Sequence, residues 1–275
     1  MGQGAMGDFM MIRFLCCVFL GFGLLASGSA YSAAAQGYVH EIRGDVQAVV
    51  GSGQSVKLEK NQSLPDNTTV TTGTDSHAII KFIDGTVIAL NQNTSFTIQK
   101  FDYNEKSPST MTAFFSMLRG GLRVVTGAMS QRNREGFRLA TPNSTIGIRG
   151  TEFMLQQVNP TIISVLSGIT SMNNVAGTVS FSAGQFGFAG SSTTLPVFIT
   201  ELPPNVLTSF NYLQGLNLPP ATPNSLPQGG GPGNVNPGVG GMSGGVVGGV
   251  AGAAAAAAAI AGGGSSSSPV ITNTQ

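Results

Sequence analysis

Apolar and polar residues alternate along most of the chain from residue 36 to residue 195, and this period of two predicts β-strands. The clearest segment is SHAIIKFIDGTVIALNQ, residues 76–92, in which two alternating runs flank the dipeptide Asp84-Gly85. A two-residue hairpin needs positive φ angles, which this dipeptide tolerates well. The segment therefore predicts two antiparallel strands joined by a tight turn.

Further short apolar runs follow, separated by glycines or by a proline-asparagine pair at intervals of roughly eight to fifteen residues. Residues 109–118, STMTAFFSML, are also compatible with a short helix, but their flanks favour a strand. The sequence predicts an all-β fold, a solenoid- or sandwich-like stack of short antiparallel strands. The remaining predicted strands are SFTIQKF, GLRVVTG, GFRLAT, TEFMLQQV, TIISVLSG, GTVSFSAG and FGFAG.

The N-terminal 35 residues have the features of an export signal. Arg13 precedes the apolar run FLCCVFLGFGLLA, and SAAAQ offers a cleavage site after Ala35. An uncleaved membrane anchor is the alternative. Cys16 and Cys17 both lie inside this segment, so we expect the mature chain to contain neither a disulfide nor a reactive thiol.

The C-terminal part changes in composition. Residues 196–240 are rich in Pro, Asn and Gly, which predicts an extended or disordered linker. Residues 241–275 form a Gly/Ala/Ser-rich, low-complexity tail. Its segment 246–261 leaves three alternatives open: a flexible tail, a weak helix that self-associates or touches a membrane, or a membrane span.

Charge and motif content exclude several classes of function. The net charge is +1, which argues against a nucleic-acid surface. His40 and His77 are the only histidines, and the predicted β domain, residues 36–195, contains no HExxH, G-x-S-x-G, P-loop or GxGxxG motif. We therefore expect no enzymatic activity, no catalytic residues, no cofactor, no metal site and no small-molecule substrate.

Three blocks of the sequence resemble the FecR domain, a β-rich extracytoplasmic module. The first block is LPDNTTVTTGTDSHAIIKFIDGTVIALNQNTSFTI, residues 64–98. The second is LRGGLRVVTG, residues 118–127, followed by FRLATPNSTIGIRGTEF, residues 137–153. The third and looser block is ISVLSGITSMNNVAGTVSFSAGQ, residues 163–185. The resemblance covers about residues 66–185, within a predicted β domain of residues 36–195.

The family motif residues have a structural interpretation. Pro142 fixes φ and extends the residue before it, while Gly147 and Gly150 allow positive φ or close backbone approach. Arg149 has Glu152 as a candidate partner, and a binding role for this pair is the alternative. The motif residues are Gly73, Asp84, Gly85, Gly127, Thr141, Pro142, Gly147, Arg149, Gly150, Thr151, Glu152 and Phe153.

The resemblance implies an extracytoplasmic location and protein–protein contacts. In the regulator that names the family, a cytoplasmic anti-sigma region precedes the domain, but here only about a dozen residues precede the apolar run. The sequence predicts a non-catalytic exported envelope protein, in the periplasm or on the surface of a Gram-negative bacterium. Its domain would be a scaffold for an unidentified envelope protein partner, with β-edge pairing as one mode of contact. The alternatives are a surface adhesin or glycan-binding protein, and a signalling relay without the anti-sigma region.

Overall fold

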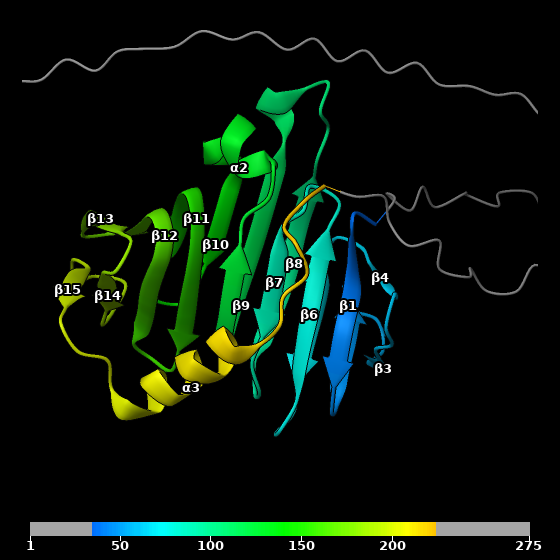
Figure 1. The fold of residues 1–275 in the computed structure, drawn as a ribbon, viewed down its shortest axis with the longest axis horizontal. Coiled ribbons are helices and arrows are strands. Elements are labelled where there is room, and N and C mark those ends of the chain that lie inside the picture. The colour runs from blue at the N-terminus through cyan, green and yellow to red at the C-terminus, as the bar shows by residue number, and fades with distance from the viewer. Residues whose placement is uncertain (1–34, 224–275) are drawn as a thin grey trace, which may run out of the picture. The chain divides into compact units, whose positions relative to one another are not determined.

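The computed structural model describes residues 35–223 of the chain. The predicted signal peptide, the linker beyond residue 223 and the Gly/Ala-rich tail lie outside these residues, apart from Ala35. The described part contains one mixed sheet of 15 strands that is not closed (Figure 1). The prediction of an all-β fold is confirmed.

Three long strands organise this sheet, because each of them bends and contributes one half to each of two layers. They are β9 (Thr112–Val125), β11 (Thr145–Gln157) and β12 (Thr161–Asn174). The first half of β9 pairs with β8, and its second half pairs with β7 and β11. The two layers are therefore parts of one continuous sheet.

The first layer, here called the helix-covered layer, has the order β4-β1-β6-β7-β9-β11-β12-β14-β15. Its own strands are β1 (Gly37–Arg43), β4 (Ser63–Leu64), β6 (His77–Phe82), β7 (Val87–Leu90), β14 (Phe186–Ala189) and β15 (Val197–Ile199).

The second layer, here called the bare layer, has the order β3-β2-β5-β8-β9-β10-β11-β12-β13. Strand β10 runs parallel to β9, which makes the sheet mixed. Its own strands are β2 (Val46–Val50), β3 (Val56–Lys57), β5 (Thr68–Thr72), β8 (Ser95–Asp102), β10 (Phe137–Ala140) and β13 (Gly177–Ser182). Three short helical turns lie outside the strands: η1 (Pro108–Thr110), α2 (Met129–Arg132) and η2 (Arg134–Gly136).

Glycines sit at the bends of the three long strands. Gly120, Gly150 and Gly168 have φ angles of +99°, +58° and +74°, which L side chains rarely adopt. A Cβ on Gly168 would lie 2.0 Å from the carbonyl oxygen of Gly150 in the neighbouring strand. The sequence analysis expected glycines to separate short strands, but these three lie within long strands and change their direction.

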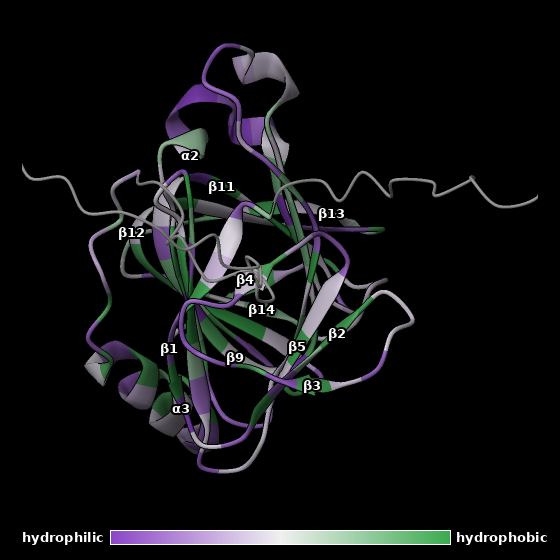
Figure 2. Ribbon diagram, turned by 90° about the vertical axis from the view of Figure 1, so that its right-hand side faces the viewer, coloured by the Kyte–Doolittle hydropathy of each residue, from purple (hydrophilic) through white to green (hydrophobic). Residues whose placement is uncertain are grey.

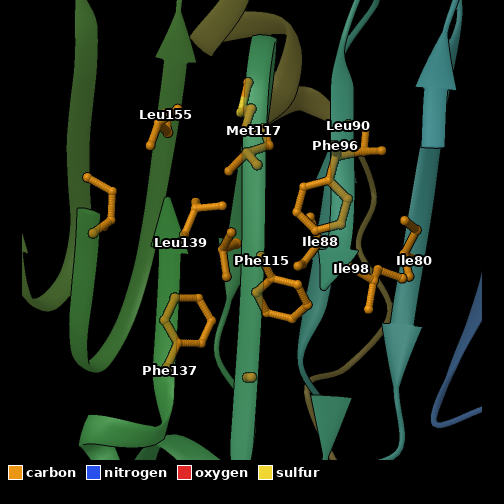
Figure 3. Packing of buried hydrophobic residues seen from close by; sticks show 14 of the residues in the cluster. Ile80, Ile88, Leu90, Phe96, Ile98, Phe115, Met117, Phe137, Leu139 and Leu155 are labelled. Carbon is orange, nitrogen blue, oxygen red and sulfur yellow. The ribbon is translucent and has the colours of Figure 1, made fainter. Parts of the chain in front are cut away.

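The main hydrophobic core fills the space between the two layers. Phe82 of the helix-covered layer stacks on Phe101 of the bare layer, with ring centroids 4.4 Å apart. Phe115 of β9 contacts both Phe82 and Phe96 at centroid distances of 5.4 Å. Figure 3 shows Phe115 and Phe96 side by side in this core. These side chains are almost fully buried, so the stacking of the layers supplies most of the apolar burial.

A second hydrophobic cluster lies on the outer face of the helix-covered layer, beneath α3 (Pro204–Gly215). Figure 2 shows the arrangement from the side, with α3 on one side of the sheet and β2, β3 and β5 on the other. Strands β6 and β7 are buried at every position because both of their faces are covered. This double burial explains why AIIKF and VIAL are nearly continuous apolar runs.

Residues 196–223, which the sequence analysis assigned to the linker, fold onto the sheet as β15, α3 and the chain that follows. Val206, Phe210 and Leu213 of α3 are buried at helical spacing, and the helix starts at a proline pair. In Figure 1 the chain after α3 rises across the sheet. A Cβ on Gly85 would lie 2.6 Å from the carbonyl carbon of Thr222, so this segment reaches the β6–β7 hairpin.

The β6–β7 hairpin is present, but its loop has three residues, Ile83–Gly85, rather than two. Phe82 N–H donates to the Thr86 carbonyl at 2.9 Å, and Gly85 N–H donates to the Phe82 carbonyl at 3.0 Å. Only Gly85 in this loop has a positive φ angle, +91°. A single left-handed residue after a turn is the usual geometry of a three-residue hairpin loop.

Substitution at two of the bends should separate backbone strain from steric clash. Gly150→Ala meets no atom within 4 Å, so we expect it to lower the free energy of unfolding by only about 1–2 kcal/mol, from φ strain alone. Gly120→Ala would bring Cβ within 2.4 Å of Thr94 Cα, so we expect a loss of about 3 kcal/mol or more.

Urea denaturation would measure both variants. Gly150→Asn is the control. It should lower the free energy of unfolding less than Gly150→Ala does, because Asn tolerates the left-handed region. If Gly120→Ala and Gly150→Ala lowered the free energy of unfolding equally, the close packing of Gly120 against Thr94 would be contradicted.

Candidate functional site

An arginine-lined groove of about 680 Å³ lies on the bare layer, across β10, β11 and β12. Arg134, Arg138 and Arg149 line it, and Glu135 is the one acidic lining residue. The Arg138 guanidinium lies over the Phe114 ring, 5.4 Å from the ring centroid. This surface, called the arginine groove below, presents three positive charges close together.

Arg149 belongs to the sequence motif IGIRGTEF, and its guanidinium points to the solvent side of the bare layer. The Arg149 guanidinium makes no ion pair and no hydrogen bond with any other residue between 35 and 223. The sequence analysis named Glu152 as its candidate partner, and the structure contradicts that pairing. The bend at Gly150 lies between the two residues, so Arg149 and Glu152 belong to different layers.

Glu152 instead pairs with Arg123 of β9. The Arg123 Nε donates to Glu152 Oε1 at 2.8 Å, and Nη2 donates to the same oxygen. The two side chains are only 16% and 24% exposed. Arg123 Nη1 also donates to the carbonyls of Leu213 and Gln214, at 3.2 Å each, so the pair holds the C-terminal end of α3.

Two other polar contacts fix α3 along its length. Ser209 accepts a hydrogen bond from Asn91 Nδ2 at 2.8 Å and donates to Gln156 Oε1. Tyr212 is hydrogen-bonded to buried His77, which also contacts Glu41. Together with the apolar contacts, these bonds determine the position of the helix on the sheet.

Asp84 of the hairpin is fully buried and joins two of the family blocks. Its carboxylate accepts hydrogen bonds from the Thr86 N–H and hydroxyl, both at 2.8 Å, and from the Met129 N–H at 3.4 Å. Gly127 packs against this loop, since a Cβ there would lie 2.4 Å from the Asp84 carbonyl oxygen. Burial raises the pKa of the Asp84 carboxyl above its ordinary value, although the hydrogen bonds oppose the shift.

The other motif residues lie in turns or in the core. Gly73 donates its N–H to the Asp45 carbonyl at 2.9 Å, and Thr141 closes the turn that contains Pro142. Gly147 packs against Ser171, where a Cβ would lie 2.7 Å from the hydroxyl oxygen. Phe153 is completely buried, and Thr151 nearly so.

The described residues contain no group of three or more His, Cys, Asp or Glu side chains that could hold a metal ion. No helix between residues 35 and 223 is long and apolar enough to cross a membrane. The expectation that the protein has no catalytic, cofactor or metal site stays a prediction.

Comparison with protein families identifies the β domain. Residues 68–170 match the family model described as "FecR protein". This chain carries a FecR domain. The match spans the Asp84-Gly85 hairpin and the IGIRGTEF motif, so the resemblance stated from the sequence is confirmed there. FecR proteins are non-enzymatic regulatory proteins with protein partners in signalling.

Solved structures similar to this chain include two crystal structures, at 1.65 and 2.50 Å resolution, of a protein from Parabacteroides distasonis ATCC 8503. That protein is provisionally named an anti-sigma factor. Both are 16% identical, with a TM-score of 0.40 and coverage of 54% of this chain. The matched part spans 65% and 64% of those chains. No curated protein matches the sequence significantly.

The sequence analysis missed Arg123 and α3 as partners of the FecR motif. A signal existed for the helix, because Val206, Phe210 and Leu213 recur at intervals of four and three residues. The high Pro and Asn content around this segment favoured a linker. Nothing in the sequence pairs Arg123 with Glu152, because that contact depends on the register between β9 and β11.

Removal of the Glu152 charge should loosen α3. We expect Glu152→Gln to lower the free energy of unfolding by about 1–3 kcal/mol, because Arg123 stays largely buried without its counter-ion. Hydrogen exchange of the α3 amides should also become faster. The exposed Glu59→Gln is the control, with an expected change below about 0.5 kcal/mol. A variant whose α3 amides exchange as slowly as in the wild type would contradict the role of the Arg123–Glu152 pair in holding α3.

The pH dependence of stability should report the buried Asp84. Because its folded pKa is raised, its contribution is fully present below the ordinary pKa of 3.8 and is lost as pH rises through the folded pKa. We expect the stability of Asp84→Asn, relative to wild type, to increase as pH rises from 3 to 7. Urea denaturation at several pH values measures this difference, and a flat difference would contradict the assignment.

Proposed function

We propose that this protein is a non-catalytic, exported protein-interaction module of the cell envelope. Its arginine groove receives an acidic segment of an envelope protein. The FecR domain supports this proposal because its family is regulatory and is consistent with a signalling-related role. The apolar N-terminal run supports export to the periplasm or surface of a Gram-negative bacterium.

The observation that carries the proposal is the unpaired Arg149 at the centre of the family motif. A guanidinium with no partner among the described residues keeps all its donors available to a ligand. Arg138 is held in place by the Phe114 ring beneath it. Pre-positioned guanidinium groups suit carboxylates, because each can donate two parallel hydrogen bonds to one carboxylate.

The charge distribution favours a protein over a nucleic acid as the partner. The whole chain has a net charge of +1, and the arginine groove has three arginines against one glutamate. A nucleic-acid surface would need basic residues spread along a phosphate backbone. A compact cluster of this size matches a few acidic side chains, and such pairs determine specificity and association rate.

Site-specific photo-crosslinking in intact cells is the first test of this function. A photoreactive amino acid in place of Ser171, which lines the groove, should capture an envelope protein. The control is the same substitution at exposed Gln47 on β2, at the far side of the bare layer. A separately encoded membrane signalling protein among the captured proteins would support the relay alternative.

Charge reversal then decides whether the captured protein uses the arginine groove. We expect Arg138→Glu/Arg149→Glu to weaken binding of the purified partner about tenfold or more, through loss of charge-assisted hydrogen bonds. Lys57→Glu/Lys60→Glu, which changes two exposed charges elsewhere, is the matched control and should leave the affinity within about twofold. Equal affinities of the two double variants, measured by calorimetry, would refute the proposal.

A further inference from the structure

A second and larger groove, here called the amide groove, lies where α3 meets the turns at one end of the sheet. Its volume is about 1340 Å³. The walls come from the turns around residues 91–93, 156–159 and 190–192, and from one side of α3. None of its lining residues belongs to the arginine groove, so the two surfaces are separate.

The lining of this groove is rich in amide side chains. Eight of the lining residues are asparagine or glutamine, against three charged residues, Arg43, Asp75 and Arg119. Amides offer donors and acceptors without a net charge. A site of this kind suits a neutral ligand that itself carries many donors and acceptors.

Several of these amides are fixed at one atom and free at the other. Gln156 Oε1 accepts from Ser209, and Gln92 Oε1 accepts from the Asp75 N–H at 2.9 Å. The Nε2 atoms of both glutamines make no hydrogen bond within residues 35–223, and neither does the side chain of Asn205. The groove therefore presents oriented donors, which reduces the entropy that a ligand must lose on binding.

Apolar and aromatic surface lies beside these donors. Leu118 is 68% exposed, Val158 47% and Tyr212 40%, and all three line the groove. Such surface packs against the C–H faces of sugar rings, while the amides pair with ring hydroxyls. An extended peptide fits less well, because the lining consists mainly of turns and a helix, which offer a peptide backbone no continuous strand edge.

We propose that the amide groove binds a neutral oligosaccharide. Its volume exceeds the roughly 300–1,000 Å³ of pockets for single drug-sized ligands, which suits a chain of several sugars. Binding there would contact α3 on one side and the sheet turns on the other. The inference goes beyond the proposed protein-interaction function, and it would place a glycan ligand and a protein partner on separate surfaces of one domain.

The test uses the full-length mature protein and an immobilised panel of neutral and acidic oligosaccharides, followed by calorimetry with soluble tetrasaccharides of N-acetylglucosamine and of glucose. We expect at least one neutral tetrasaccharide to bind, with a dissociation constant between about 1 µM and 1 mM. Binding of acidic glycans alone, or of no glycan on the panel, would overturn the proposal.

A matched pair of variants on α3 locates the binding. Asn205→Trp places a large side chain in the groove and should weaken binding at least about tenfold, whereas Asn211→Trp lies on the same helix outside the groove and should change it less than about twofold. Both positions are exposed, so both variants should fold. Arg138→Glu/Arg149→Glu should leave glycan binding unchanged, which separates this result from the test of the arginine groove. Equal affinities of Asn205→Trp and Asn211→Trp for the oligosaccharide would refute the amide groove as its binding site.

Discussion

The bends of β9, β11 and β12 are the constraint on which the rest of the structure depends. Each strand changes direction at a glycine with positive φ. The bends of β11 and β12 lie side by side, because Gly168 approaches the Gly150 carbonyl, whereas Gly120 of β9 pairs with Gln157 at the far end of β11. Because the strands continue through the bends, the two layers share hydrogen-bonded strands and enclose one core. Side chains larger than hydrogen at these positions would add backbone strain, and at Gly120 and Gly168 also a clash with neighbouring atoms.

The bend at Gly150 also explains how one short motif supplies two different surfaces. Before the bend, Arg149 faces solvent on the bare layer, where it lines the arginine groove. After the bend, Glu152 faces the outer side of the helix-covered layer and holds Arg123 against the end of α3. Two residues separated by only Gly150 and Thr151 therefore act on opposite sides of the domain.

Uncharged polar groups replace charges in the second half of the domain. After Phe153 the sequence contains one charged residue, Glu201, yet β12, β13, β14 and α3 are ordered. Amides and hydroxyls pair with each other in the interior here, as in the hydrogen bond from Gln157 Nε2 to Asn143 Oδ1 at 3.0 Å, although the buried hydroxyl of Thr170 has no partner among the described residues.

The sequence by itself determined the all-β class, the β6–β7 hairpin and the FecR blocks, because these depend on local periodicity and on turn residues such as Gly85. It could not show that β9 and β11 continue through their glycines, since a glycine with positive φ ends a strand or bends it according to its neighbours. Only the tertiary structure decided the partner of Glu152, the docking of α3 and the two grooves. Each of these depends on strand register or on segments far apart in the chain, such as Arg123 and Leu213, and local sequence patterns carry no information about such distances.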